Sequence, residues 1–191
     1  KNIGLTKSLN LGIAKAKGDY IARQDADDIS MPDRFLNFIE YIRNNDDFTI
    51  YSTPAYIINE SSEIKKIIPN YFRRNGFNER LLDYFNSMVH GTLIIKSNII
   101  KKHLYNEKFY FAQDFELYHR LINLGYKISY DKHNITYKLR IHGDSISTNN
   151  KKQIKSYKSI LILNNKKVYE KSIINRLYFK IIELCFFIKN K

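Results

Sequence analysis

The sequence predicts an α/β domain, and three observations lead to this prediction. Segments whose apolar residues recur at helical spacing alternate along the chain with short runs of β-branched and aromatic residues. The chain has 191 residues, of which 43% are hydrophobic and 14% aromatic, enough for a buried core. A strand-like segment near the N-terminus ends in a cluster of acids, and ligands of α/β sheets bind where strands end.

The elements of the N-terminal part follow from local spacing. A helix is expected from about residue 5 to residue 16, and Gly18 is expected to end it. The segment YIARQ, residues 20–24, is expected to form a strand. A second helix is expected over residues 34–45, with Ser30 as a candidate cap. Its inner face is expected to consist of Phe35, Phe38, Ile39 and Ile42.

Local spacing also predicts the elements in the middle of the chain. Residues 48–59 are expected to form one or two strands, and the polar residues 60–77 an irregular loop. A helix over residues 77–86 and a strand over residues 91–96 follow. Ser97 is expected to cap a further short helix.

The C-terminal half begins with the clearest helix. Its apolar residues recur at helical spacing over residues 113–124, and Gly125 is expected to end it. Residues 127–131 and 135–142 are expected to be strands, and residues 150–190 a helical tail.

Three acids, Asp25, Asp27 and Asp28, follow the strand predicted at residues 20–24. In an extended chain, residues two apart point the same way, so Asp25 and Asp27 are expected to converge on one divalent cation, which takes oxygen ligands. A simpler role for Asp28 and Asp33 is to stabilise the N-terminus of the following helix. That role remains an alternative for the Asp25 and Asp27 pair as well.

Residues 2–35, NIGLTKSLNLGIAKAKGDYIARQDADDISMPDRF, closely resemble the central segment of family 2 glycosyltransferases with the GT-A fold. The family's Asn-x-Gly-Leu helix, Gly-(Asp/Glu)-Tyr-Ile strand and Asp-x-Asp motif followed by Pro and Arg occur here in the same order. QDFELYHRL, residues 113–121, is similar to a family helix that usually begins with Glu rather than Gln113. RIHGDSIS, residues 140–147, and VHGTLIIK around His90 match two further segments.

The resemblance implies the architecture. Residues 1–148 are expected to form a partial GT-A domain, which is a Rossmann-like mixed sheet flanked by helices, and residues 149–191 a basic amphipathic helical tail. The family's first strand and nucleotide-base loop are expected ahead of Lys1, so the resemblance implies an N-terminally incomplete domain.

The resemblance also implies roles on the donor side of a glycosyl transfer. Asp27 is expected to bind Mn²⁺ or Mg²⁺ directly, Asp25 to lie beside the ribose and the metal, and Asp28 to support the loop. His142 is a candidate ligand of the metal or the diphosphate, and an ordinary strand histidine is its alternative role. The donor is expected to be a nucleotide-sugar, first of all a UDP-sugar.

On the acceptor side, the resemblance makes Asp114 the general base of an inverting reaction. A favourable acid at a helix start is the alternative role of Asp114. Glu116 is the other candidate base, or it shapes the acceptor pocket. His90 is either an acceptor-site residue or a core residue. The remaining histidines have no motif context and are expected at the surface: His103, His119 and His133.

Charge is uneven along the chain. The net charge is +13, and residues 150–191 hold eleven Lys and Arg against two Glu, a net +9. The tail is expected either to pack on the catalytic body or to lie on an anionic membrane surface. With a single cysteine, Cys185, the chain has no intrachain disulfide, which fits a reducing compartment.

Taken together, the sequence predicts a cytoplasmic enzyme, with peripheral attachment to the inner face of the plasma membrane left open. Its acceptor is expected to be a glycan or lipid-linked hydroxyl in surface polysaccharide or lipid-linked glycan synthesis. The alternative is a catalytically inactive basic module that binds a membrane surface or nucleic acid. No nucleic-acid motif is recognised in the sequence, so a nucleic-acid partner is not expected.

Overall fold

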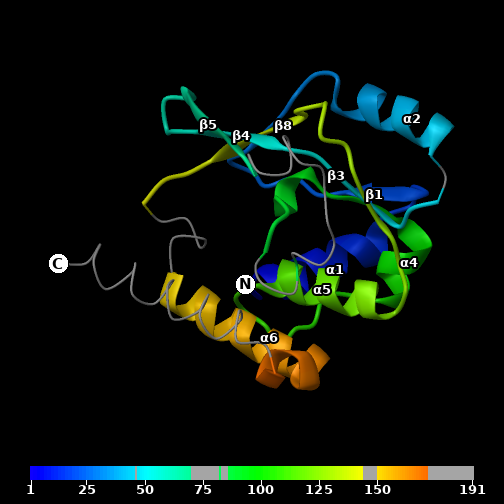
Figure 1. The fold of residues 1–191 in the computed structure, drawn as a ribbon. Coiled ribbons are helices and arrows are strands. Elements are labelled where there is room, and N and C mark those ends of the chain that lie inside the picture. The colour runs from blue at the N-terminus through cyan, green and yellow to red at the C-terminus, as the bar shows by residue number, and fades with distance from the viewer. Residues whose placement is uncertain (46, 70–81, 83–85, 144–149, 172–191) are drawn as a thin grey trace.

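Two mixed sheets organise the chain in the computed structural model, which describes residues 1–45, 47–69, 82, 86–143 and 150–171 (Figure 1). The strands of the first sheet are, in spatial order, β1 (Tyr20–Ala22), β6 (Ile94–Lys96), β3 (Ile50–Ser52) and β7 (Ile128–Tyr130). β6 is antiparallel to both of its neighbours, whereas β3 and β7 are parallel. The fold is therefore the mixed α/β type that the sequence predicts.

The second sheet also has four strands. Its strands are, in order, β2 (Ile29–Ser30), β8 (Tyr137–Arg140), β4 (Ala55–Ile58) and β5 (Ile64–Ile68). β8 is antiparallel to β2 and parallel to β4, and β4 and β5 form a hairpin. β5 corrects the expectation of an irregular loop over residues 60–77: its strand pairs with β4 through the backbone, although most of its side chains face solvent.

Helices cover both faces of the first sheet (Figure 1). α2 (Arg34–Asn44) lies on one face, and α1 (Leu5–Lys15), α4 (Ser97–Lys102) and α5 (Gln113–Asn123) lie on the other. α6 (Asn150–Lys171) packs against α5 rather than against a sheet. A short 3₁₀ helix, η2 (His90–Thr92), leads into β6.

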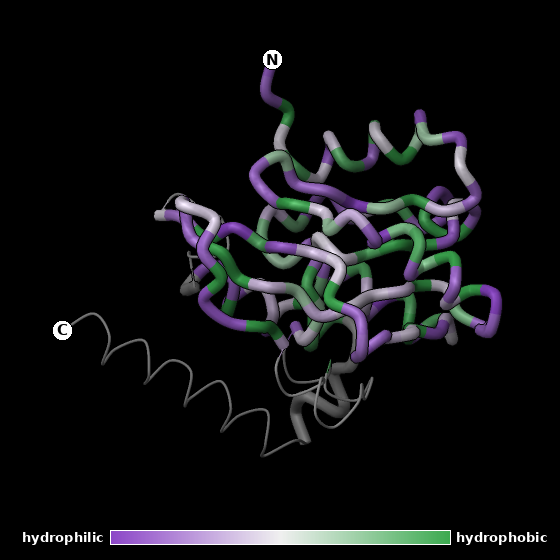
Figure 2. Tube along the Cα trace, turned by 90° about the horizontal axis from the view of Figure 1, so that it is seen from above, coloured by the Kyte–Doolittle hydropathy of each residue, from purple (hydrophilic) through white to green (hydrophobic). Residues whose placement is uncertain are grey.

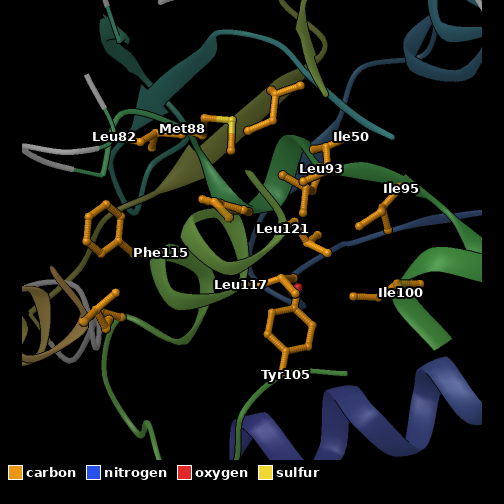
Figure 3. Packing of buried hydrophobic residues seen from close by; sticks show 14 of the residues in the cluster. Ile50, Leu82, Met88, Leu93, Ile95, Ile100, Tyr105, Phe115, Leu117 and Leu121 are labelled. Carbon is orange, nitrogen blue, oxygen red and sulfur yellow. The ribbon is translucent and has the colours of Figure 1, made fainter. Parts of the chain in front are cut away.

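Alternation along the strands divides the apolar residues between these two layers. Ile50 and Ile95 are cross-strand partners that point toward α1 and α5, in the cluster that Figure 3 shows. Their neighbours Tyr51 and Ile94 point to the opposite face and pack with Phe38 of α2. This period of two is what a sheet buried on both faces requires.

The orientation of α2 differs from the sequence expectation. Phe38 is buried and Ile42 packs beside it, but Phe35 and Ile39 are 55% and 43% exposed. Arg34 is instead buried, because its side chain turns inward beneath the acidic loop. A helix with apolar residues on more than one face does not reveal from its pattern alone which face is buried.

Three expected helix boundaries are also corrected. α1 ends at Lys15 with a backbone cap at Ala16, so Gly18 is not its stop. Ser30 belongs to β2 and does not cap α2. Ser97 is the first residue of α4 and makes no side-chain cap bond. Gly125, by contrast, follows α5 with a φ of 85°, as expected for a glycine that ends a helix.

The expected helix at residues 77–86 lies outside the described residues, apart from residues 82 and 86. The same holds for the apolar part of the tail, residues 172–191. Figure 2 shows hydrophilic and hydrophobic residues mixed along most of the tube. None of the described helices is both long and apolar enough to cross a membrane.

Candidate active site

The acidic residues lie in a tight turn where β1 ends. The backbone N–H of Asp28 bonds to the carbonyl of Asp25 (3.3 Å), and the Gln24 side chain donates to the carbonyl of Asp28 (2.9 Å). The backbone N–H of Asp25 donates to the hydroxyl of Tyr137 (3.2 Å). The extended conformation assumed for Asp25 and Asp27 is therefore replaced by a turn, and the two carboxylates face different partners.

Each acid of this turn has its own environment. Asp25 is ion-paired with Arg23. The carboxylate of Asp27 is about half exposed, and its Oδ2 lies 3.1 Å from Nε2 of His142. Asp28 is buried, and its Oδ1 accepts the backbone N–H of Arg140 (2.7 Å). Burial raises the pKa of Asp28, and the N–H of Arg140 partly offsets this rise.

The side chain of Arg140 forms hydrogen bonds with both the acidic turn and the β4–β5 hairpin. Its Nε donates to the carbonyl of Asp27 (2.8 Å), and its Nη1 donates to the carbonyls of Asn59 (2.7 Å) and Glu60 (2.9 Å). Its Nη2 donates to Oγ of Ser62 (3.0 Å). Because His142 follows two residues later on the same chain segment, these hydrogen bonds also set where His142 meets Asp27.

Asp114 lies in the first turn of α5, two residues after the N-cap Ala112, whose φ of 57° is in the left-handed region. Its Oδ2 accepts a hydrogen bond from the side-chain amide of Asn86 (2.6 Å). Burial raises the pKa of Asp114, while the N–H of Phe115, the Asn86 amide and the charge of Arg23 act in the opposite direction. Asp114 is thus a buried, hydrogen-bonded carboxyl group on which the effect of burial exceeds that of the nearby positive charge.

Arg23 connects the two halves of the site. Its side chain is 10% exposed, pairs with Asp25, and lies close enough to Asp114 to influence its pKa. His90 adjoins the same region: its Nε2 is 2.7 Å from the hydroxyl of Tyr105. Burial, with a smaller effect of Arg23, lowers the pKa of His90 well below its ordinary value, so its ring is neutral at neutral pH.

Glu116 and His119 of α5 point away from solvent. Glu116 is buried and makes a two-point ion pair with Arg120, at 2.8 and 3.1 Å, so both of its carboxylate oxygens are engaged. His119 was expected at the surface, but it is buried, and its Nε2 donates to the carbonyl of Leu82 (2.7 Å). No local pattern predicts this contact, because residues 82 and 119 are 37 positions apart in the chain.

A cavity of about 340 Å³ lies beside this site, between α1 and strands β1 and β6. Its walls are mostly apolar, and Arg23, Gln24 and Tyr105 form its polar part. In the described part of the chain, no group of three or more His, Cys, Asp and Glu side chains is placed to hold a metal ion. The available donors are thus the pair of Asp27 and His142, with Asp25 nearby in the same turn.

Four residues of this region had no role predicted from the sequence: Arg23, Asn86, Tyr105 and Tyr137. Arg34 and Arg140 belong to the recognised family segments, but their side-chain hydrogen bonds are visible only in the structure. No local pattern predicts the contacts of Tyr105 and Tyr137, because their partners are far away in the sequence.

Comparisons with known proteins agree with this picture. The family model described as glycosyl transferase family 2 matches residues 1–104. An uncharacterised glycosyltransferase of Methanocaldococcus jannaschii is 31% identical over 161 residues, which covers 82% of this chain and 54% of that protein. The O-antigen biosynthesis glycosyltransferase WbnJ of Escherichia coli is 32% identical over 127 residues, covering 66% of this chain and 49% of WbnJ.

Among solved structures, S. aureus TarS in complex with UDP-GlcNAc has a similar fold, with a TM-score of 0.66 at 12% identity. The match covers 92% of this chain and 50% of the solved TarS chain, which comprises residues 1–349. The chain spans about half the length of the curated relatives it matches.

Proposed function

Because the chain belongs to glycosyl transferase family 2, we propose that it transfers a sugar from a nucleotide-diphosphate donor to an acceptor hydroxyl, with inversion at the anomeric carbon. The observation that supports this best is the arrangement around Arg23. The guanidinium of Arg23 is ion-paired with Asp25 of the acidic turn, and its charge also acts on the candidate base Asp114. The candidate donor site and the candidate base therefore share one buried arginine as a neighbour.

The donor side would use a divalent cation, Mn²⁺ or Mg²⁺. Asp27 and His142 offer one carboxylate oxygen and one imidazole nitrogen 3.1 Å apart, and Asp25 offers a second carboxylate in the same turn. Two or three protein ligands fit an ion that also binds phosphate oxygens of a substrate. When bound, such an ion neutralises the negative charge that develops on a departing diphosphate.

On the acceptor side, Asp114 would act as the general base. The oxygen of the acceptor hydroxyl forms the new bond to the anomeric carbon, its proton passes to the carboxylate of Asp114, and the bond to the diphosphate breaks with its electron pair leaving on the diphosphate. Burial favours this role, because a carboxylate with a raised pKa binds a proton more readily. No covalent enzyme intermediate is needed.

Two further residues would serve the acceptor side indirectly. His90 is neutral and adjoins Arg23, so it can offer a hydrogen bond without adding charge. Glu116 is held by Arg120, so in this proposal it shapes the wall behind Asp114 and does not take the proton. Asp28, bonded to Arg140, would support the turn that binds the donor.

Two similar proteins support the choice of substrates. TarS is solved with UDP-GlcNAc, and WbnJ acts in O-antigen biosynthesis. We therefore take a UDP-sugar as donor and a growing surface glycan or its lipid-linked precursor as acceptor, with the reaction on the cytoplasmic side. The described part of the tail packs on α5 through Ile154, Ile160 and Leu161, which leaves lysines such as Lys152 exposed for an anionic membrane surface.

The test is titration calorimetry of UDP with and without Mn²⁺ on the full-length gene product. Asp27→Ala should abolish the Mn²⁺-dependent part of UDP binding. Asp114→Asn should leave binding intact and remove turnover. The matched control is Asp33→Asn, an exposed acid of the same segment whose carboxylate accepts a hydrogen bond from the side chain of Asn37 (3.0 Å).

An inactive basic binding module would respond differently. Neither Asp27→Ala nor Asp114→Asn would then change anything beyond what Asp33→Asn changes. That outcome, in a protein shown to be folded by circular dichroism, would reject the glycosyltransferase proposal for this chain.

A further inference from the structure

We propose that Tyr137 and Arg34 are positioning residues that hold the acidic turn, residues 25–28, in the shape that binds the metal and the diphosphate. The inference rests on the proposed function and adds to it two buried side chains, neither of which reaches the substrate. They contact the turn from its buried side and connect it to two other segments of the chain.

Tyr137 reaches the turn from the second sheet. The residue is fully buried at the start of β8, and its hydroxyl accepts the backbone N–H of Asp25 (3.2 Å). The same hydroxyl interacts with the carboxyl group of Asp28. One phenol oxygen thus touches the backbone of one acid and the side chain of another. Because a buried N–H without a partner is costly, this contact determines where Asp25 lies.

Gly91 makes room for the ring of Tyr137. A Cβ atom at residue 91 would lie 2.4 to 2.6 Å from the Cε1, Cζ and hydroxyl oxygen of Tyr137. The ring is therefore seated directly against η2, the segment that also carries His90. Any shift of Tyr137 would move the acidic turn relative to His90.

Arg34 contacts both the ring of Tyr137 and the residues on either side of the acidic turn. It is 1% exposed, and its guanidinium lies over the ring of Tyr137 at 4.9 Å from the ring centre. Its Nη2 donates to the carbonyls of Arg23 and Gly91, both at 2.9 Å. Its Nη1 donates to Oγ of Ser30 (2.8 Å) and Oε1 of Gln24 (3.1 Å).

The hydrogen bonds of Arg34 indicate that it holds both ends of the acidic turn. Its hydrogen bonds reach Arg23 before the acidic turn and Ser30 after it, so the two ends of the turn are held by one rigid fork. Each of these four acceptors is a neutral oxygen, so the burial of the guanidinium is not explained by an ion pair. Such a costly arrangement is consistent with a site that needs a preorganised loop.

Tyr137→Phe is the decisive variant, because it removes one oxygen atom and keeps the ring. On the full-length gene product we expect the dissociation constant of UDP in the presence of Mn²⁺ to rise about 10-fold, which is typical for loss of a supporting contact around metal ligands. Binding of UDP without Mn²⁺ should change much less. A purely structural role would lower the melting temperature without this metal-dependent difference.

Tyr51→Phe is the matched control. Tyr51 is also buried in a sheet, but its hydroxyl donates to Oδ2 of Asp131 (3.1 Å) and not to a residue of the acidic turn. Both variants lose one buried hydrogen bond, but only Tyr137→Phe should weaken Mn²⁺-dependent binding. Equal effects of the two variants, or no effect of Tyr137→Phe, would overturn the proposal.

Arg34→Lys provides a second measurement. Lysine keeps the positive charge but lacks the planar fork, so it cannot hold both ends of the turn at once. The expected result is a loss of Mn²⁺-dependent UDP affinity of up to about 100-fold in folded protein. If Asp27→Ala leaves that affinity unchanged, the proposed function fails; if Asp27→Ala abolishes it and Tyr137→Phe does not, only the present inference fails.

Discussion

At the scale of single residues, Asp114 shows how the fold holds a reactive carboxylate. It is bonded to a neutral amide, that of Asn86, and to backbone N–H groups at the start of α5. The nearest basic side chain that acts on it, Arg23, is already paired with Asp25. Burial therefore outweighs these partners, and the pKa of Asp114 is raised.

This environment predicts the pH dependence of the reaction. A base must be ionised, so kcat/KM should fall as the pH drops through the raised pKa of Asp114, at a pH above the 3.8 of an ordinary aspartate. Asp114→Asn should lower kcat by about 10²- to 10⁴-fold, the range for loss of a general base. A pH–rate profile of wild type whose acid limb lies at or below the ordinary aspartate value would contradict this.

The same environment predicts how the stability of the folded chain depends on pH: Asp114 lowers this stability at high pH and not at low pH. Below pH 3.8 the group is protonated in the folded and unfolded chain alike and has no influence on stability. As the pH rises, the unfolded chain ionises first, so stability falls until the pH exceeds the raised pKa of the folded state. Asp114→Asn removes this loss, and we expect a higher melting temperature at pH 8 and no difference at pH 3. Asp33→Asn should show neither change.

At the scale of elements, the contact between η2 and β8 fixes how the two sheets meet. Tyr137 of β8 packs against Gly91 of η2, and Thr136 just before it bonds to Thr53 between β3 and β4 (2.8 Å). The carbonyl of Thr136 also accepts the N–H of Met31 (2.9 Å), which follows β2. The start of β8 therefore joins the acidic turn, η2 and the β3–β4 connection.

Gly91→Ala is predicted to strain this junction. The new methyl group would meet the ring of Tyr137 at 2.4 Å, so the ring or η2 must move. Overpacking of this kind costs about 1 to 3 kcal/mol in the free energy of unfolding, which urea titration measures. The control is Gly12→Ala within α1, where a Cβ meets no atom within 4 Å and a helical alanine stabilises by about 1 kcal/mol. Equal stabilities of the two variants would show that the close approach at Gly91 is not maintained in solution.

At the scale of the whole molecule, α6 combines exposed basic residues with exposed apolar ones. α6 buries Ile154, Ile160 and Leu161 against α5, while Lys152 and Lys155 are exposed and Leu163 is 71% exposed. Exposed lysines beside exposed apolar side chains suit an anionic lipid surface.

We predict that the full-length gene product binds vesicles of anionic lipid and not vesicles of phosphatidylcholine alone. Lys152→Glu with Lys155→Glu should weaken this binding more than 10-fold, because each basic residue near such a surface contributes about 1 kcal/mol. The matched control reverses Lys65 and Lys66 on β5, which are equally exposed but lie in the second sheet. Equal binding to both kinds of vesicle in a sedimentation assay would contradict the prediction.

Much of the fold was accessible from local sequence patterns. The α/β class, the strand that ends in the acids and the helix of Asp114 with its stop at Gly125 all follow from periodicity and turn chemistry. The strand β5 and the buried face of α2 did not, because β5 owes its strand to backbone pairing with β4 and α2 has apolar residues on two sides.

The sequence by itself thus determined the fold class and the candidate acids, because helical and strand periods and the spacing of motif residues are local properties. Only the tertiary structure decided which side chains meet: Asp27 with His142, Asp114 with Asn86, and Asp25 with Tyr137. The last two residues are 112 positions apart, and no local pattern relates them. Such contacts form when the two sheets pack together around a buried arginine. This packing depends on the whole chain at once.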